Sequence, residues 1–197
     1  MKRIIFATSN EGKMKEIRMI LADLGVEILS LKDAGIQVEI EENGTTFEEN
    51  AIIKAKTIME LTGDIVLSDD SGLEVDYMDK APGVYSARFM GENTSYDVKN
   101  QYIIDQLKDA KEEERTARFV CVIACAFPDG EVVTRRGTIE GTIAKQICGT
   151  NGFGYDPIFY VPEYGCTTAE LTSEQKNQIS HRAKALNAIK EVLEENC

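Results

Sequence analysis

The chain has 197 residues with 34 acidic and 22 basic side chains, which gives a formal net charge of −12. This length fits one compact domain, and a composition of 43% hydrophobic and 28% charged residues excludes a disordered chain. The acidic excess excludes broad, non-specific nucleic-acid binding, which needs a basic surface, but it leaves room for a basic pocket that takes a small anion.

The first part of the chain predicts two strands and two helices. Residues 3–7 are short and apolar, which is typical of a strand, and apolar residues three and four apart predict a helix over 13–24. Alternating apolar and polar residues predict a half-buried strand over 36–41. Residues 46–49 have the spacing of a capping box, so a helix should run from there to about residue 61.

The middle of the chain predicts short strands around two adjacent aspartates. Residues 65–67 should form a buried strand that ends at Asp69 and Asp70. Further short strands are expected over 73–75 and 84–87.

The remaining chain predicts a helix over 95–107, a strand over 119–127, a turn at 128–130, a partner strand over 131–143 and a closing helix over 181–194. The strand over 119–127 is apolar throughout, which is typical of a central strand buried on both faces. Interleaved strands and helices with one long hairpin indicate an α/β protein with a mixed sheet.

Membrane and zinc proteins are not expected. The longest apolar run has nine residues, far short of the roughly 20 that span a bilayer, and the N-terminus lacks the apolar length of a signal peptide. The five cysteines include no Cys-x-x-Cys pair and there is one histidine, so a zinc site is disfavoured. We therefore expect a single cytoplasmic domain over residues 1–197.

The segment Thr8-Ser9-Asn10-Glu11-Gly12-Lys13 joins the first strand to the first helix. Free backbone N–H groups at a helix start bind phosphate, and the hydroxyls and Lys13 add donors and charge. A plain N-cap followed by a solvated lysine is the alternative. The segment lacks the two-glycine spacing of a Walker loop.

Two groups of carboxylates suit a magnesium site. Asp69 and Asp70 follow a buried strand, and aspartates there can bind Mg²⁺ or take a proton from water. A glutamate from the cluster of Glu39, Glu41 and Glu42 could complete the site. A simple turn after the strand and solvated glutamates are the alternatives.

Two later segments suit a nucleotide base. Residues 149–157 combine three glycines with Phe153, Tyr155 and Asp156, which could stack on a flat ring and accept a hydrogen bond, or plug the core of a tight turn. Residues 180–182 place His181 and Arg182 in a first helical turn, where positive side chains oppose the helix dipole and so suggest a local purpose. A structural histidine is the alternative.

Six segments occur together in the order and spacing of one family. The chain resembles the inosine/xanthosine triphosphate pyrophosphatases over residues 3 to about 190. The segments are Thr8–Lys13, Thr46–Ala51, Asp69–Leu73, Pro82–Arg88, Gly152–Pro157 and Ser180–Arg182.

The resemblance implies an elongated mixed sheet flanked by helices, in two lobes with a central cleft. It implies Mg²⁺-dependent hydrolysis of ITP, dITP and XTP to the monophosphate and pyrophosphate, by a homodimer. Asp70 would be the proton acceptor and, with Glu41, the metal ligand, and Asp69 would support the metal. The implied substrate contacts are Thr8, Ser9, Asn10, Glu11, Gly12, Lys13, Ser71, Phe153, Gly154, Tyr155, Asp156, Lys176, His181 and Arg182.

The chain departs from the family pattern at two places. Asp79-Lys80 stands where many relatives have two glycines, and Asn151 stands where glycine is frequent. Neither carries an expected catalytic role. The choice between Glu41 and Glu42 as metal ligand is uncertain by one position, since both precede a polar turn. A broader nucleotide phosphatase, a modified-pyrimidine nucleotide pyrophosphatase and a non-enzymatic nucleotide-binding protein are the alternative functions.

Overall fold

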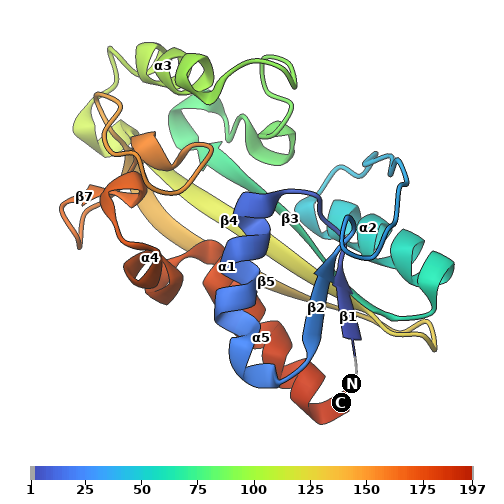
Figure 1. The fold of residues 1–197 in the computed structure, drawn as a ribbon. Coiled ribbons are helices and arrows are strands. Elements are labelled where there is room, and N and C mark those ends of the chain that lie inside the picture. Colours follow the sequence, from blue (N-terminus) through green and yellow to red (C-terminus); the bar gives the residue numbers. More distant parts are fainter. Residues whose placement is uncertain (1–2, 197) are drawn as a thin grey trace. The chain divides into compact units, whose positions relative to one another are not determined.

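A computed structural model describes residues 3–196 (Figure 1). Its strands form one mixed sheet in the order β2-β1-β3-β4-β5-β6-β7. β1 runs parallel to β2 and β3, whereas β6 runs antiparallel to β5 and β7. The strands are β1 Arg3–Phe6, β2 Glu27–Ser30, β3 Ile65–Val75, β4 Thr116–Ala126, β5 Val132–Ile143, β6 Phe159–Val161 and β7 Cys166–Thr167. The helices are α1 Glu11–Leu21, α2 Phe47–Thr62, α3 Tyr96–Gln106, α4 Ser173–Ile179 and α5 His181–Asn196.

The chain divides into two compact units, each made of separate segments. Unit 1 contains the residues up to Asp70, Cys121–Gly137 and the residues from His181 on. Unit 2 contains Ser71–Val120 and Thr138–Ser180. The chain therefore passes between the two units more than once.

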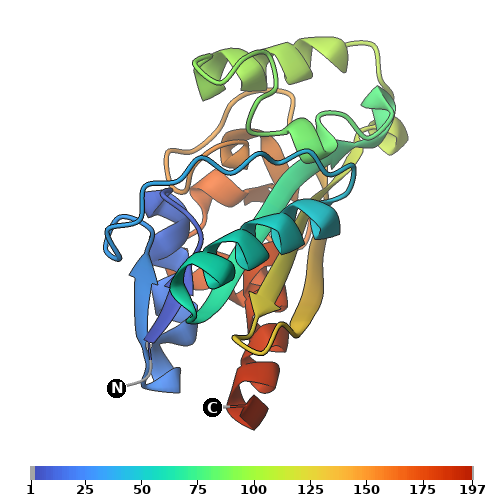
Figure 2. The same ribbon diagram turned by 90° about the vertical axis from the view of Figure 1, so that its right-hand side faces the viewer.

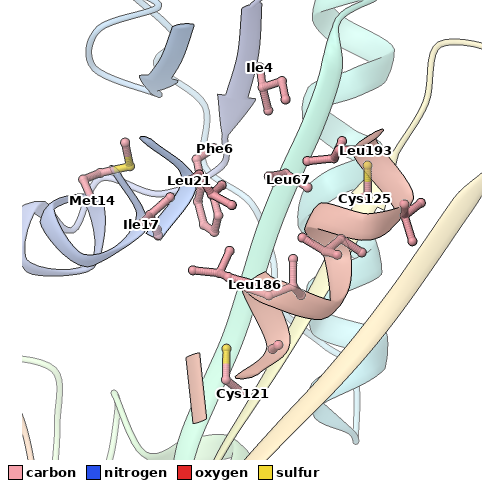
Figure 3. Packing of buried hydrophobic residues seen from close by; sticks show 14 of the residues in the cluster. Ile4, Phe6, Met14, Ile17, Leu21, Leu67, Cys121, Cys125, Leu186 and Leu193 are labelled. Atoms are coloured by element: carbon pink, nitrogen blue, oxygen red, sulfur yellow. The ribbon is translucent and has the colours of Figure 1, made fainter. Parts of the chain in front are cut away.

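In unit 1, α1 and α5 lie side by side on one face of the strands, and α2 covers the other face (Figures 1 and 2). The apolar faces of α1 and α5 pack on β1, β3 and β4, with Phe6, Ile17, Leu67 and Leu186 at the centre (Figure 3). Burial of such side chains contributes about 25 cal/mol for each Å² of apolar surface. This core fixes the starts of α1 and α5, where several of the predicted site residues lie.

In unit 2, a second core forms around β4, β5 and α3, with Phe119 stacked on Phe159 at 4.3 Å between ring centroids. Arg115 is buried there, and its guanidinium donates to the carbonyl oxygens of Leu107, Ile143 and Ala144. Those three bonds join the end of α3 to the end of β5.

Helices with strong apolar periodicity form as predicted. The inward residues of α2 and α5 are buried, and Ser95 caps α3 at the predicted start. The Thr46 hydroxyl caps α2 by accepting from Glu49 N, but the Glu49 carboxylate accepts from Thr45 rather than completing the predicted box.

Two strand predictions are wrong, and two others are right in their residues but wrong in where the strand ends. Residues 36–41 are irregular, because their alternating pattern finds no pairing strand and Val38 is exposed; the edge strand is β2 instead. Residues 84–87 begin in a 3₁₀ turn over Gly83–Tyr85. Residues 65–67 and 73–75 belong to one strand, β3, whose polar middle is buried, so Asp69 and Asp70 lie within a strand and not at its end.

The turn at Asp79-Lys80 keeps the backbone conformation that glycines favour. Asp79 has φ 51° and Lys80 has φ 68°, both left-handed. The departure from the family pattern therefore changes the side chains of this turn but leaves a glycine-like backbone.

Candidate functional site

The loop between β1 and α1 is organised by its own side chains. Asn10 is the N-cap of α1 and its Oδ1 accepts from Lys13 N at 3.1 Å, while Thr8 Oγ1 accepts from Asn10 N at 3.1 Å. Ser9 and Glu11 are exposed. The segment forms the predicted helix start, and its binding of phosphate remains a prediction.

Asp69 lies at the centre of a buried charge cluster in unit 1. Its carboxylate is 3.0 Å from Lys13 Nζ and 3.5 Å from Arg182 Nη2. Arg182 is buried and its Nη1 lies 2.5 Å from Glu16 Oε2. The cluster thus joins β3 to the first turns of α1 and α5.

The pKa of Asp69 shows how the cluster is balanced. Burial alone raises the pKa of a carboxyl group, but the charges of Lys13, Arg182 and Lys54 outweigh it and hold the pKa of Asp69 well below its usual range. Asp69 is therefore ionised and acts as the counterion of the buried Arg182 and the half-buried Lys13.

Asp70 has a different environment one residue later. It is buried, its Oδ1 lies 3.8 Å from Lys54 Nζ, and its Oδ2 has no hydrogen-bond partner among the described residues. Burial raises the pKa of Asp70 to about 6, Lys54 opposes the rise, and the negative charges of Glu42 and Asp69 add to it. A carboxylate with such a pKa can take a proton near neutral pH.

The structure places Glu42, and not Glu41, in this group. Lys54 Nζ lies 2.8 Å from Glu42 Oε1, so one ammonium contacts both Glu42 and Asp70. Glu41 and Glu39 are exposed. The assignment of Glu41 as metal ligand stays a prediction, and the geometry favours its neighbour.

The carboxylates of unit 1 fit a magnesium ion in part. Residues 3–196 hold no preassembled group of three or more His, Cys, Asp or Glu side chains for a metal. Mg²⁺ is usually held by one or two carboxylates together with water and substrate phosphates, so two carboxylates suffice. The free buried oxygen of Asp70 is the atom that suits such an ion.

A glycine sets the start of α5. A Cβ at Gly137 of β5 would lie 2.3 Å from the carbonyl oxygen of His181 and 2.7 Å from Ala185 N, so only glycine allows this approach. His181 and Arg182 are both buried in the first turn. The carboxylates of Glu16 and Asp69 explain how Arg182 is tolerated at the positive end of a helix.

In unit 2, the loop over residues 151–156 and α4 build a second polar group around Asp156. The buried Asp156 accepts from Lys176 Nζ at 2.7 Å, from Phe153 N at 2.9 Å and from Thr168 Oγ1 at 2.8 Å. Lys176 Nζ lies 4.8 Å from the centre of the half-buried Phe153 ring. At Gly152, with φ +71°, a Cβ would lie 2.2 Å from Asp156 Oδ2, so a larger residue would displace this carboxylate.

The predicted site residues thus fall into one group in each unit. Lys13, Asp69 and Arg182 meet in unit 1, and Phe153, Asp156 and Lys176 meet in unit 2. Ser71 is half-buried in unit 2. Sequence reasoning missed Glu16 and Thr168. The signal for Glu16 was a charge on the buried side of α1, three residues after Lys13.

Residues 4–192 match the model of the Ham1 family. The chain belongs to the Ham1 family. It is 47% identical over 199 residues to a dITP/XTP pyrophosphatase of Clostridium perfringens, with 98% of each chain covered. It is also 47% identical to a dITP/XTP pyrophosphatase of Bacillus subtilis, again with 98% of each covered.

Solved Ham1 structures share the fold. The Ham1 protein of Staphylococcus aureus superposes with a TM-score of 0.88 at 41% identity over 100% of both chains. A HAM1 protein from Coxiella burnetii gives a TM-score of 0.89 at 41% identity, covering 99% of this chain and 100% of the other. The family and fold class predicted from the six segments are confirmed.

Within residues 3–196, no helix of this Ham1 chain has both the length and the apolar character needed to cross a membrane.

Proposed function

We propose that this chain is a dITP/XTP/ITP pyrophosphatase, which hydrolyses noncanonical purine nucleoside triphosphates to the monophosphate and pyrophosphate and so removes deaminated purines from the nucleotide pool. The observation that carries the proposal is Asp70, a buried carboxylate with a partnerless oxygen beside a lysine. Full-length relatives named dITP/XTP pyrophosphatases support the same reaction.

The residues of unit 1 have distinct roles in this reaction. The loop from Thr8 to Lys13 binds the triphosphate through helix-start N–H groups and the ammonium of Lys13. Asp70 orients the attacking water and takes its proton as water attacks the α-phosphorus and the bond to the pyrophosphate oxygen breaks. Asp69 is held by Lys13 and Arg182, so it supports this arrangement.

Asp70 and one glutamate before α2 would hold Mg²⁺, with Glu42 favoured over Glu41 because Lys54 already brings Glu42 close to Asp70. Bound there, the ion would neutralise phosphate charge and stabilise the leaving pyrophosphate. The Asp69 carboxylate is already paired with Lys13 and Arg182, so Asp69 is the weaker candidate for a metal ligand.

The base would be recognised by stacking and by hydrogen bonds. Phe153 offers a ring, and the pair of Asp156 and Lys176 offers an acceptor and a donor next to it. His181 and Arg182 are the proposed contacts near the 6-oxo edge. A site whose buried donors need a 6-oxo partner leaves them unpaired against a 6-amino base, which can reject the wrong base by roughly 10⁴.

A nucleotide panel tests the proposal. Initial rates with ITP, dITP, XTP, ATP and GTP are measured in the presence of Mg²⁺, with products identified. We expect turnover of the first three at a kcat/KM at least about 10²-fold above that of ATP. Equal rates on all five would favour a broader nucleotide phosphatase. A faster rate on a modified pyrimidine triphosphate, assayed beside them, would favour the related pyrophosphatase, and binding without turnover would favour a non-enzymatic protein.

Chelation of the metal should abolish turnover and strongly weaken triphosphate binding. Glu42, Asp69 and Asp70 put negative charge where an anionic substrate must lie, so we expect the affinity for ITP to fall by about 10²-fold or more when EDTA replaces Mg²⁺. Isothermal titration with ITP measures this directly. Tight ITP binding in excess chelator would contradict the metal's role.

The cytoplasmic location and the homodimer belong to the same proposal. Size-exclusion chromatography with light scattering tests the second, with a mass near twice the 21.9 kDa of one chain expected.

A further inference from the structure

Asn100 of α3 holds the loop that carries Phe153. Asn100 is buried and its Nδ2 donates to the carbonyl oxygen of Gly154 at 3.1 Å. Its Oδ1 is also buried and has no hydrogen-bond partner among the described residues. A buried acceptor that has lost its water weakens folding, so an apolar side chain would suit this position better if packing were its whole purpose. The amide therefore serves the bond to Gly154.

The residue after Gly154 is fixed by the same helix. Tyr155 packs edge-on against Tyr96 of α3, with 5.2 Å between ring centroids and an interplanar angle of 90°. The Tyr155 hydroxyl donates to the carbonyl oxygen of Ser86 at 2.6 Å, and the Tyr155 ring is buried in the core of unit 2. Lys99, also on α3, donates to the carbonyl oxygen of Ala87 and lies 4.7 Å from the centre of the Tyr96 ring.

The side chains on either side of this fixed pair belong to the polar group around Asp156, in which the half-buried Phe153 ring is the part that stays partly exposed. Phe153 precedes the fixed pair and Asp156 follows it, and Phe153 N donates to Asp156 Oδ2. The backbone at Gly154 has φ +64°, so the loop reverses there and its carbonyl orientation depends on an external donor. Among the described side chains, Asn100 donates the hydrogen bond that fixes this carbonyl.

We propose that Asn100 is a positioning residue for base recognition: its Nδ2 fixes the Gly154 carbonyl and thereby the orientation of the Phe153 ring toward the purine. The inference rests on the proposed function. It adds a residue that contacts neither the base nor the phosphates, on a helix that carries no predicted substrate contact.

The test compares Asn100→Leu with the wild type. Leucine has a similar branched shape and removes both the donor and the partnerless acceptor, so we expect the melting temperature to stay level or rise. The loss of one loop-orienting hydrogen bond should raise the KM for ITP by about tenfold while kcat changes less than about twofold, because Asn100 does not contact the Asp70 group. Gln101→Leu, at an exposed position on the same helix, is the matched control and should leave both parameters unchanged.

A second readout does not depend on turnover. The chain has no tryptophan, so Phe153→Trp introduces a single tryptophan, whose emission is followed apart from that of the tyrosines. In that background, Asn100→Leu should lower the steady-state fluorescence anisotropy of this tryptophan, while Gln101→Leu should not.

The outcomes separate the inference from the proposed function. If the wild type releases no pyrophosphate from ITP, the proposed function fails, and the anisotropy still decides whether Asn100 orders the loop. If Asn100→Leu keeps the wild-type KM and anisotropy, the inference is overturned even where ITP is a substrate. If the variant loses stability, Asn100→Ser, which keeps a small polar side chain, replaces it, and an unchanged KM and anisotropy there also overturn the inference.

Discussion

The Asp70→Asn variant should lose nearly all turnover of ITP and still fold. An amide cannot accept the proton of the attacking water, and loss of a general base of this kind costs about 10²- to 10⁴-fold in kcat. Folding should not suffer, because the Asp70 carboxylate makes no hydrogen bond among the described residues and its charge is buried near those of Glu42 and Asp69. We expect an unchanged or raised melting temperature.

Pyrophosphate release and thermal unfolding, measured on the same preparation, test this prediction. Asp109→Asn, the same change at an exposed aspartate, is the control and should keep wild-type activity. Release of pyrophosphate from ITP by Asp70→Asn at a near-wild-type rate would refute the assignment of the base.

The Asp69→Asn variant should be strongly destabilised. Asp69 is fully buried between Lys13 and Arg182, and removing its charge leaves two cations facing each other without a shared counterion. Breaking a buried ion pair in this way costs about 3–5 kcal/mol. Arg182 keeps its ion pair with Glu16, so Lys13 is the cation that loses its carboxylate partner.

Urea unfolding followed by circular dichroism gives the free energies for this comparison. The matched control is Asp70→Asn, because the same chemical change one residue along β3 is expected to have the opposite sign or no effect. Equal unfolding free energies for Asp69→Asn and the wild type would show that Lys13 and Arg182 do not depend on this carboxylate.

The fold could be predicted where the pattern is long and buried. The helices at residues 47–62 and 181–196 repeat apolar residues over several turns, and the strand at 116–126 is apolar from Phe119 on, so each has one low-energy placement. The edge strand β2 has four residues with only Ser30 fully buried, and its pairing with β1 decides its structure. This pairing joins residues that are far apart in the sequence, so the local pattern predicted a strand over 36–41 instead of β2.

The candidate site divides in the same way. Asp70 was found because two adjacent carboxylates follow the apolar residues 65–67, at the kind of position where α/β sheets place their ligands. Glu16 was missed because its partner Arg182 lies 166 residues away, and only folding brings them together. Glu41 and Glu42 are neighbours in an irregular segment, so no periodicity in the sequence distinguishes them as metal ligands. The contact of Glu42 with Lys54 favours Glu42.

Product analysis of ITP hydrolysis tests the central claim most directly. With Mg²⁺ present and water labelled with ¹⁸O, attack at the α-phosphorus should give IMP that carries the label together with unlabelled pyrophosphate. Formation of IDP and labelled orthophosphate would contradict a pyrophosphatase and would identify a phosphatase that removes the terminal phosphate.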